Sequence, residues 1–223
     1  MDLPGFGYSD RPWPYDYTAA AQVLHLWQFL DARAVDRVVL VGNSLGGAVA
    51  LLAAAAKPER IAGLVLADAA SPGVRIPLQF RLMRAPLAGE LEMELLSRPT
   101  MAWVLRYRMF ARPERVTSET ISDWWDPVPI PGTRRAALAA IRSNPDEYQD
   151  VGRRIEAPTL VLWGERDRVL PPSEGLRLSK EIRGSSFMTI PDTGHLPQEE
   201  SPAEFARAVA SFVGLLPPKN PPG

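Results

Sequence analysis

A single serine stands between glycines in the stretch VVLVGNSLGGAVA, residues 38–50. An apolar, β-branched run precedes it and an alanine- and leucine-rich run follows, which predicts a strand that turns sharply into a helix. A serine hydroxyl is a poor nucleophile unless it is exposed and activated. A sharp turn exposes the Ser44 side chain beside a helix N-terminus, whose N–H groups stabilise negative charge. The spacing Gly42-x-Ser44-x-Gly46 therefore indicates a nucleophile that attacks a carbonyl carbon; the alternative is a glycine-rich turn with an idle serine.

The glycines around this serine have an expected steric purpose. Glycine at positions 42 and 46 should relieve crowding in the turn, and Gly47 should let the helix pack close to the strand.

A nucleophilic serine needs a base, and the chain has two histidines. His25 falls within a predicted amphipathic helix, where a surface or packing role is expected. His195 lies in IPDTGHLPQE, directly after a predicted strand, at the edge of the sheet where α/β proteins build their sites. We therefore interpret His195 as a general base, a surface loop histidine being the alternative. Asp192, three residues earlier, is expected to support the loop turn.

The carboxylate that orients the base should also follow a strand. Asp167 in VLWGERDRV meets this condition, and Glu165 and Asp68 are rivals, since Asp68 ends a strand of its own. The chain order Ser44, Asp167, His195 runs nucleophile, acid, base. Asp68 would give the same order, so order alone does not choose, and we favour Asp167.

The predicted elements bring these residues to one edge of a parallel sheet. Strands are expected over 37–41, 61–66, 159–163 and 185–190, and helices over 18–33, 45–56, 172–181 and 202–213. Short links between strand, helix and strand favour right-handed crossovers.

The expected organisation is a split core. The α/β core would occupy 1–71 and 151–214, separated by a helical cap over 72–150, where Arg, Met, Trp and Pro follow helical periodicity. A proline-rich flexible tail is expected over 215–223.

Composition excludes several classes of protein. Lys plus Arg is 25 against 26 for Asp plus Glu, so the basic excess of a nucleic-acid binder is missing. No apolar run approaches the ~20 residues of a membrane helix, and the start lacks a signal-peptide pattern, so we expect a cytoplasmic protein without a membrane partner. With no cysteine and two unpaired histidines, no metal is expected. No cofactor is expected either, because G-N-S-L-G-G lacks the dinucleotide-binding spacing. The sequence does not specify the oligomeric state.

Four blocks make the chain resemble the α/β-hydrolase superfamily, in its branch of cap-bearing serine hydrolases: DLPGFGYSD, VGNSLGGAVAL, LVLWGERDRVLP and IPDTGHLPQEESPAEF. The resemblance implies an α/β fold with a mostly parallel sheet, flanking helices and a helical cap inserted after the second strand of this chain. It implies Ser44 as nucleophile, His195 as general base and then acid, and Asp167 as its orienter. The N–H of Leu45 would be one donor of the oxyanion hole.

The resemblance also narrows the chemistry. A serine at the turn excludes the branches that use aspartate there, the haloalkane dehalogenases and epoxide hydrolases. The form G-N-S-x-G-G, with PERVTSETISDWW and PGTRRAAL in the cap, resembles carbon–carbon bond hydrolases of ring-cleavage products and related esterases. We expect a small-molecule ester or C–C bond substrate and an acyl-enzyme or related intermediate. A cofactor-free perhydrolase or haloperoxidase, or a non-catalytic ligand-binding module, are the alternatives.

The resemblance further implies that the fold is N-terminally incomplete. In the family, DLPGFGYSD follows the fourth strand, and a His-Gly loop after the third strand supplies a second oxyanion donor. Those strands are expected to be absent here, so activity would be impaired and strand 37–41 would form an open apolar edge.

The cap sequence raises two questions about the substrate. Residues 75–112 hold seven arginines and three glutamates. These arginines either clamp an anionic substrate or lie along the surface with their heads in solvent, and we favour the second. Trp103, Trp124 and Trp125 either line a large apolar pocket or form the core of the cap.

Overall fold

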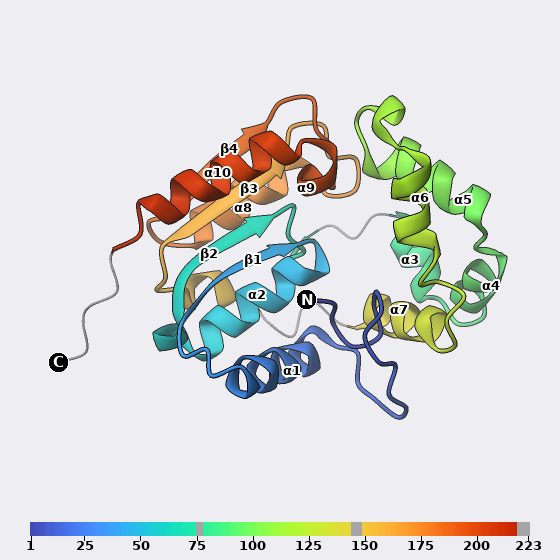
Figure 1. The fold of residues 1–223 in the computed structure, drawn as a ribbon, viewed down its shortest axis with the longest axis horizontal. Helices are drawn as coiled ribbons and strands as arrows, with labels where there is room; N and C mark the ends of the chain where they lie inside the picture. Colours follow the sequence, from blue (N-terminus) through green and yellow to red (C-terminus); the bar gives the residue numbers. More distant parts are fainter. Residues whose placement is uncertain (75–77, 144–148, 218–223) are drawn as a thin grey trace.

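The computed structural model describes residues 1–74, 78–143 and 149–217 of the chain (Figure 1). The strands are β1 (Val38–Asn43), β2 (Ile61–Ala67), β3 (Thr159–Gly164) and β4 (Ser186–Ile190). The helices are α1 (Ala19–Ala32), α2 (Leu45–Ala56), α3 (Leu78–Arg84), α4 (Ala88–Leu95), α5 (Arg98–Val104), α6 (Ser118–Trp125), α7 (Thr133–Arg142), α8 (Pro172–Glu181), α9 (Pro197–Glu200) and α10 (Pro202–Gly214). Short helical turns are η1 (Pro58–Arg60), η2 (Leu105–Met109), η3 (Pro113–Arg115) and η5 (Val151–Arg154).

The strands form one parallel sheet in the order β1-β2-β3-β4. Gly42 of β1 pairs with Leu66 of β2, and Leu66 pairs with Val161 of β3, so the carboxyl ends of the strands meet at one edge. Polar residues that follow these strands therefore come together. The predicted α/β class with a parallel sheet and flanking helices is confirmed.

Helices cover both faces of this sheet (Figure 1). On one face, α1, α2 and α8 pack against the strands in a cluster that includes Trp27, Leu51 and Leu178. On the other, Val65 and Leu162 of the sheet contact half-buried aromatic and aliphatic side chains of α10. The alanine-rich sequence of α2 lets this helix lie close to the strands, because small side chains fill little space between backbones.

Strand β1 forms one edge of the sheet. In the described part of the chain it pairs with β2 alone, and the side chain of Val41 is 47% exposed. The open apolar edge expected for this strand is therefore present in the structure.

Helices α3 to α7 lie between β2 and β3 in the sequence and to one side of the sheet in space, facing the carboxyl ends of the strands (Figure 1). One cluster of their side chains contains Leu105, Phe110 and Ile121, together with Leu196 from the loop after β4. A second joins Met83 and Met93 to Leu138. The helical insertion after the second strand is therefore present, and the division into a cap over 72–150 and core parts over 1–71 and 151–214 stays a prediction. The expected flexible tail, 215–223, lies outside the described residues from 218 onward.

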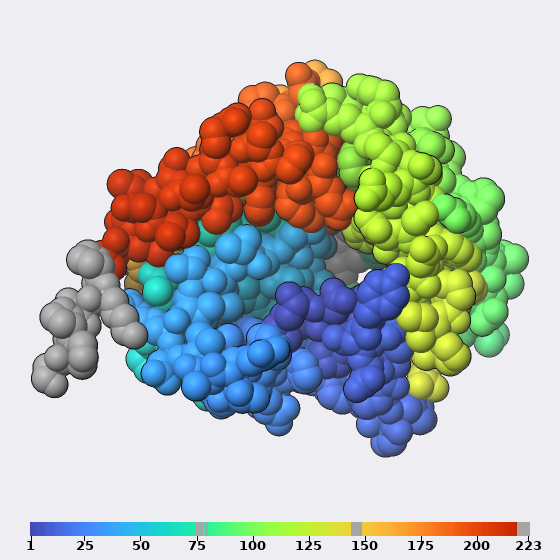
Figure 2. All heavy atoms as spheres, in the orientation of Figure 1, coloured from blue at the N-terminus to red at the C-terminus, as the bar shows by residue number. Residues whose placement is uncertain are grey.

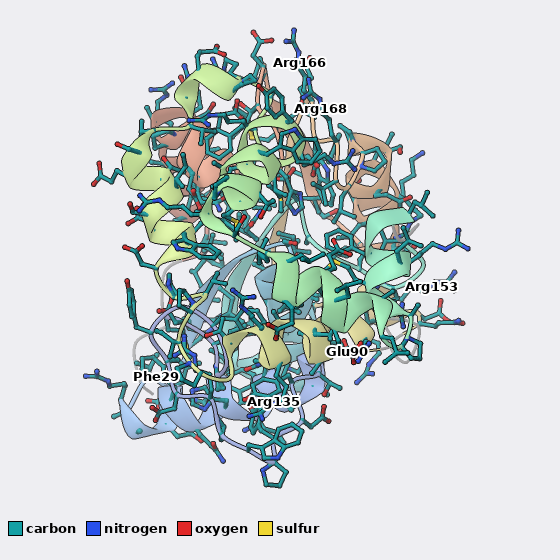
Figure 3. The ribbon with its side chains drawn as sticks, turned by 90° about the vertical axis from the view of Figure 1, so that its right-hand side faces the viewer. Phe29, Glu90, Arg135, Arg153, Arg166 and Arg168 are labelled. Atoms are coloured by element: carbon teal, nitrogen blue, oxygen red, sulfur yellow. The ribbon has the colours of Figure 1, made fainter. Side chains whose placement is uncertain are left out.

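The N-terminal loop fastens the cap to the core. Arg11 Nε donates to Thr133 Oγ1 at 2.8 Å, at the start of α7. Arg135 extends from α7 (Figure 3), and its guanidinium lies 3.9 Å from the ring centroid of Trp13. Figure 2 shows the surface hollowed between this loop, the cap and the core. Among the described residues, no helix is long and apolar enough to cross a membrane.

Candidate active site

Ser44 occupies the sharp turn between β1 and α2. Its backbone has φ 51° and ψ −116°, a conformation that costs a non-glycine residue about 1–3 kcal/mol. Hydrogen bonds hold it there: its N–H donates to Ala67 O at 3.1 Å, and its carbonyl accepts from Ala48 N and from Ala70 N at 3.0 Å. The strained turn is therefore built into both neighbouring elements.

Two of the three glycines around Ser44 are sterically required. A Cβ on Gly42 would lie 2.3 Å from Gly46 O, and a Cβ on Gly47 would lie 2.4 Å from the Cβ of Ala69. The expectation for Gly46 is wrong, because a Cβ there would meet no described residue within 4 Å outside the nearby backbone of its own helix. Position 42 is crowded because the backbone carbonyl of Gly46 points at Gly42. A side chain at position 46 would point away from this contact.

The structure brings Asp167 and His195 together at the carboxyl edge of the sheet. His195 Nδ1 lies 2.7 Å from Asp167 Oδ2, and the two residues are 2% and 6% exposed. The other carboxylate oxygen of Asp167 accepts N–H bonds from Val169 at 2.7 Å and Leu170 at 2.9 Å. With Nδ1–H donating to a carboxylate, the basic nitrogen of the neutral imidazole is Nε2.

Asn43 links this pair to the serine turn. Its Nδ2 donates to His195 O at 3.0 Å and to Ala67 O at 3.2 Å. Because Asn43 precedes Ser44 in the chain, the histidine loop and the serine turn are held to the same place.

Glu200 holds the histidine loop against the cap, and sequence reasoning missed it. Its buried carboxylate accepts N–H bonds from Gly194 at 2.7 Å, from Ala111 at 3.0 Å and from Arg112 at 2.7 Å. The backbone N–H of His195 donates in turn to Met109 O at 2.7 Å. The one signal in the sequence is an acidic residue in the loop after His195, and this does not show which segment crosses over it.

Of the two rivals to Asp167, Glu165 is exposed and accepts from Asp192 N at 3.2 Å. Asp192 has φ 51° and forms an ion pair with Arg166 at 2.7 Å, which agrees with its expected role in the loop turn. Arg166 and Arg168 mark this end of the molecule in Figure 3.

Asp68, the second rival, lies beside Asp167. It is 0% exposed, and its Oδ1 accepts from Gly164 N at 2.8 Å. Burial, with the neighbouring Asp167 charge, raises the pKa of the Asp68 carboxyl well above its usual value.

Asp68, Asp167 and His195 offer oxygen and nitrogen atoms that lie within 4.8 Å of one another, a spacing that a metal ion could use. The hydrogen bond between His195 and Asp167 already engages both groups, and two backbone N–H groups occupy the other Asp167 oxygen. We therefore interpret Asp167 and His195 as a hydrogen-bonded acid–base pair, with Asp68 buried beside it.

Leu45 is the first residue of α2, directly after Ser44. N–H groups in the first turn of a helix have no partner within the helix and are free to bind an anion. Its side chain packs with the cluster of Tyr17 and Ala136, which fixes the start of the helix. The remaining histidine, His25, lies half-buried on α1 and is not part of this arrangement.

Several cap arginines bind protein acceptors. Arg84 donates to the carbonyl of Ser143 at 3.3 Å, and Arg98 to Ser122 Oγ at 2.7 Å. Arg112 donates to Ser201 Oγ at 2.9 Å, and Arg75 lies outside the described residues. These contacts favour a structural role for these three arginines.

The tryptophans of the cap lie in different environments and do not form one apolar pocket lining. Trp103 is 55% exposed, whereas Trp124 packs against the cap cluster and donates from Nε1 to Glu199 at 3.0 Å.

Comparisons with known proteins agree with this architecture. Residues 1–202 match the α/β hydrolase fold family. A 2-hydroxy-6-oxo-2,4-heptadienoate hydrolase of Pseudomonas putida is 32% identical, over 95% of this chain and 76% of its own length. A meta-cleavage product hydrolase (CumD) from Pseudomonas fluorescens superposes with TM-score 0.81 at 25% identity, over 96% of this chain and 78% of that one. An esterase from Thermogutta terrifontis gives TM-score 0.79 at 28% identity, with the same coverage of both chains.

The strand order, the strained serine turn and the buried aspartate–histidine pair thus occur in a chain that matches this family over most of its length. The chain belongs to the α/β-hydrolase family.

Proposed function

We propose that the protein is a serine hydrolase in which Ser44 is the nucleophile, His195 the general base and Asp167 its orienter. The observation that carries the proposal is the buried 2.7 Å contact between Asp167 and His195, which Asn43 ties to the strained Ser44 turn. A serine hydroxyl at a helix N-terminus and an imidazole oriented by a buried carboxylate are the groups that acyl transfer requires.

The reaction follows from these roles. His195 Nε2 takes the Ser44 proton as Oγ attacks a carbonyl carbon, and the N–H of Leu45 donates to the resulting oxyanion. The tetrahedral intermediate collapses, the leaving group takes the proton from His195, and an acyl-enzyme remains. Water activated by His195 then releases the acid and regenerates Ser44.

For the substrate we propose the product of oxidative ring cleavage, with the bond broken between two carbons. The support is the similarity to the heptadienoate hydrolase of Pseudomonas putida at 32% identity. Small esters are the second candidate, supported by the similarity to the Thermogutta terrifontis esterase. In either case the cap over 72–150 would cover the substrate and shape its pocket.

The first prediction tests the nucleophile. A fluorophosphonate probe should label the wild-type protein and fail to label Ser44→Ala, and kcat should fall on the order of 10⁶-fold in the variant. Labelling is followed by mass spectrometry of the modified peptide, with Ser71→Ala as a control that keeps full labelling. Modification at another residue, or no labelling of folded protein, would contradict the proposal and favour a ligand-binding module.

Two substrates then separate the reaction classes. A p-nitrophenyl acetate assay reports ester hydrolysis, and loss of the dienoate absorbance of a ring-cleavage product reports C–C cleavage. Formation of peracetic acid from acetate and hydrogen peroxide, without ester hydrolysis or C–C cleavage, would favour a perhydrolase.

A further inference from the structure

Asp68 is a buried carboxyl that the proposed mechanism does not use. It follows β2 and is 0% exposed. Its Oδ1 accepts one N–H bond, from Gly164 at 2.8 Å. Its Oδ2 is also buried and has no hydrogen-bond partner among the described residues. A buried carboxylate oxygen without a donor is costly, so this atom requires an explanation.

A second carboxyl lies next to it. Asp68, Asp167 and His195 have polar atoms within 4.8 Å of one another. Asp167 is well supplied with donors, because it accepts from His195 and from two backbone N–H groups. Asp68 accepts only from Gly164 among the described residues. Two negative charges this close in a buried site repel strongly, and the group with fewer donors is the one that takes up a proton.

We propose that Asp68 is a neutral carboxylic acid in the folded protein and that its Oδ2–H donates a hydrogen bond to the Asp167 carboxylate. Asp68 then acts as a positioning residue for the Asp167–His195 pair. The proton satisfies the buried oxygen, removes the repulsion and leaves the pair with a single negative charge.

The surroundings of Asp68 support this assignment. Burial is the largest cause that raises the pKa of its carboxyl, and the Asp167 charge is the next. The Gly164 N–H lowers it, and no cationic side chain is among the described groups that act on it. In the described part of the chain, His195 also places a ring nitrogen within 4.8 Å of oxygens of both carboxyls.

The consequence for catalysis rests on the proposed function. It concerns the total negative charge of the two carboxyl groups beside His195. A neutral Asp68 holds the Asp167 carboxylate through a hydrogen bond without adding a second negative charge beside His195. An ionised Asp68 would instead place a second negative charge beside the Asp167 carboxylate, and the two charges would repel each other.

The conservative variant Asp68→Asn provides the test, because an amide keeps an acceptor for Gly164 N–H and a donor for Asp167. The infrared difference spectrum between wild type and Asp68→Asn at neutral pH should contain the C=O band of a protonated carboxylic acid. Absence of that band overturns the proposal whether or not the protein is active.

Unfolding provides a second readout that does not depend on activity. Above pH 3.8, the ordinary pKa of an aspartic acid side chain, the unfolded state releases the Asp68 proton while the folded state keeps it. Rising pH therefore disfavours folding until the raised folded-state pKa is reached. The unfolding free energy of wild type, relative to that of Asp68→Asn, should fall as pH rises from about 4. A difference that stays flat or rises with pH contradicts the proposal.

The positioning role has its own spectroscopic signature. The Nδ1–H proton of His195 should give a low-field NMR resonance in wild type and in Asp68→Asn, and lose it in Asp68→Leu. His25→Gln assigns the resonance, because the chain has two histidines. Loss of the resonance in Asp68→Asn as well would contradict the role, and if Asp68→Leu does not fold, the infrared and unfolding comparisons decide.

In the active protein, the pKa on the acid limb of kcat/KM should be the same in Asp68→Asn as in wild type. A lower pKa in the variant would mean that wild-type Asp68 is charged, which overturns the proposal. If Ser44 proves unreactive while the infrared band is present, the proposed function fails and the neutral Asp68 stands.

Discussion

At the scale of single residues, backbone hydrogen-bond donors determine which carboxyl group binds His195. Asp167 sits where the chain after β3 turns back, and Val169 and Leu170 present their N–H groups to one of its oxygens. Its second oxygen is left for His195. These backbone donors hold the Asp167 carboxyl in place, and in the proposed mechanism it keeps the imidazole of His195 in one tautomer.

Asp167→Asn should leave the fold intact and reduce kcat by about 10⁴-fold, because an amide favours the wrong imidazole tautomer. Steady-state assays with the better of the two substrates measure this loss. Glu165→Gln is the matched control, since this exposed neighbour lies outside the buried pair, and its kcat should equal that of wild type. A mild loss in Asp167→Asn together with a large loss in Glu165→Gln would reverse the assignment.

The placement of the proposed catalytic residues was predictable from the sequence because the signals that mark their positions are local. Ser44 lies between a strand and a helix, and Asp167 and His195 each follow a strand, so parallel strand order brings them to one edge. The contact between Asp68 and Asp167 was not predictable. Both residues follow strands, but only the three-dimensional register shows that β2 and β3 are neighbours and that the two side chains share one buried space.

At the scale of elements, the strand–helix turn depends on close backbone contact. Gly42→Ala should destabilise the protein by about 1–3 kcal/mol or more, because the new methyl group would collide with the Gly46 carbonyl. Gly46→Ala is the matched control, since its methyl group would meet nothing within 4 Å, and it should unfold like wild type. Chemical denaturation measures both. Equal stability of the two variants would show that the turn relaxes without cost.

Glu200 connects two elements that are far apart in the sequence. Glu200→Gln should lower the unfolding free energy by about 2–3 kcal/mol, because a buried charged acceptor of three backbone N–H bonds becomes a neutral amide. It should also lower kcat more than it changes KM, since Gly194 precedes His195. Glu204→Gln, at an exposed site on α10, is the control and should match wild type in both measurements. A variant that loses stability without any loss of kcat would confine Glu200 to a structural role.

The regular elements of the core were predicted nearly to their ends, because apolar runs of strand and helix length mark them. Strand 37–41 proves to be Val38–Asn43, and helix 45–56 is Leu45–Ala56. The packing of the cap could not be predicted from the sequence. Helical periodicity shows that residues bury a face, but it does not show that Leu196 would enter the cap cluster or that Met109 would bind the histidine loop.

At the scale of the whole molecule, the exposed edge of β1 should govern behaviour in solution. An unpaired strand with an apolar residue such as Val41 offers a template for pairing with another chain. We expect the chain to associate as its concentration rises, and Val41→Lys to reduce this association. Light scattering across a concentration series measures it, with Leu24→Lys, at an exposed position on α1, as the control that leaves association unchanged. Wild-type protein that stays monodisperse throughout would contradict this expectation.

The contact between the cap and the histidine loop has a consequence for turnover. Met109, Ala111 and Arg112 of the cap side are hydrogen bonded to the backbone of His195 and to Glu200. The cap therefore cannot move away from this part of the core without breaking hydrogen bonds that hold the His195 loop. In the proposed mechanism, product release through that side would displace His195, so water would enter freely only while Ser44 lacks its general base.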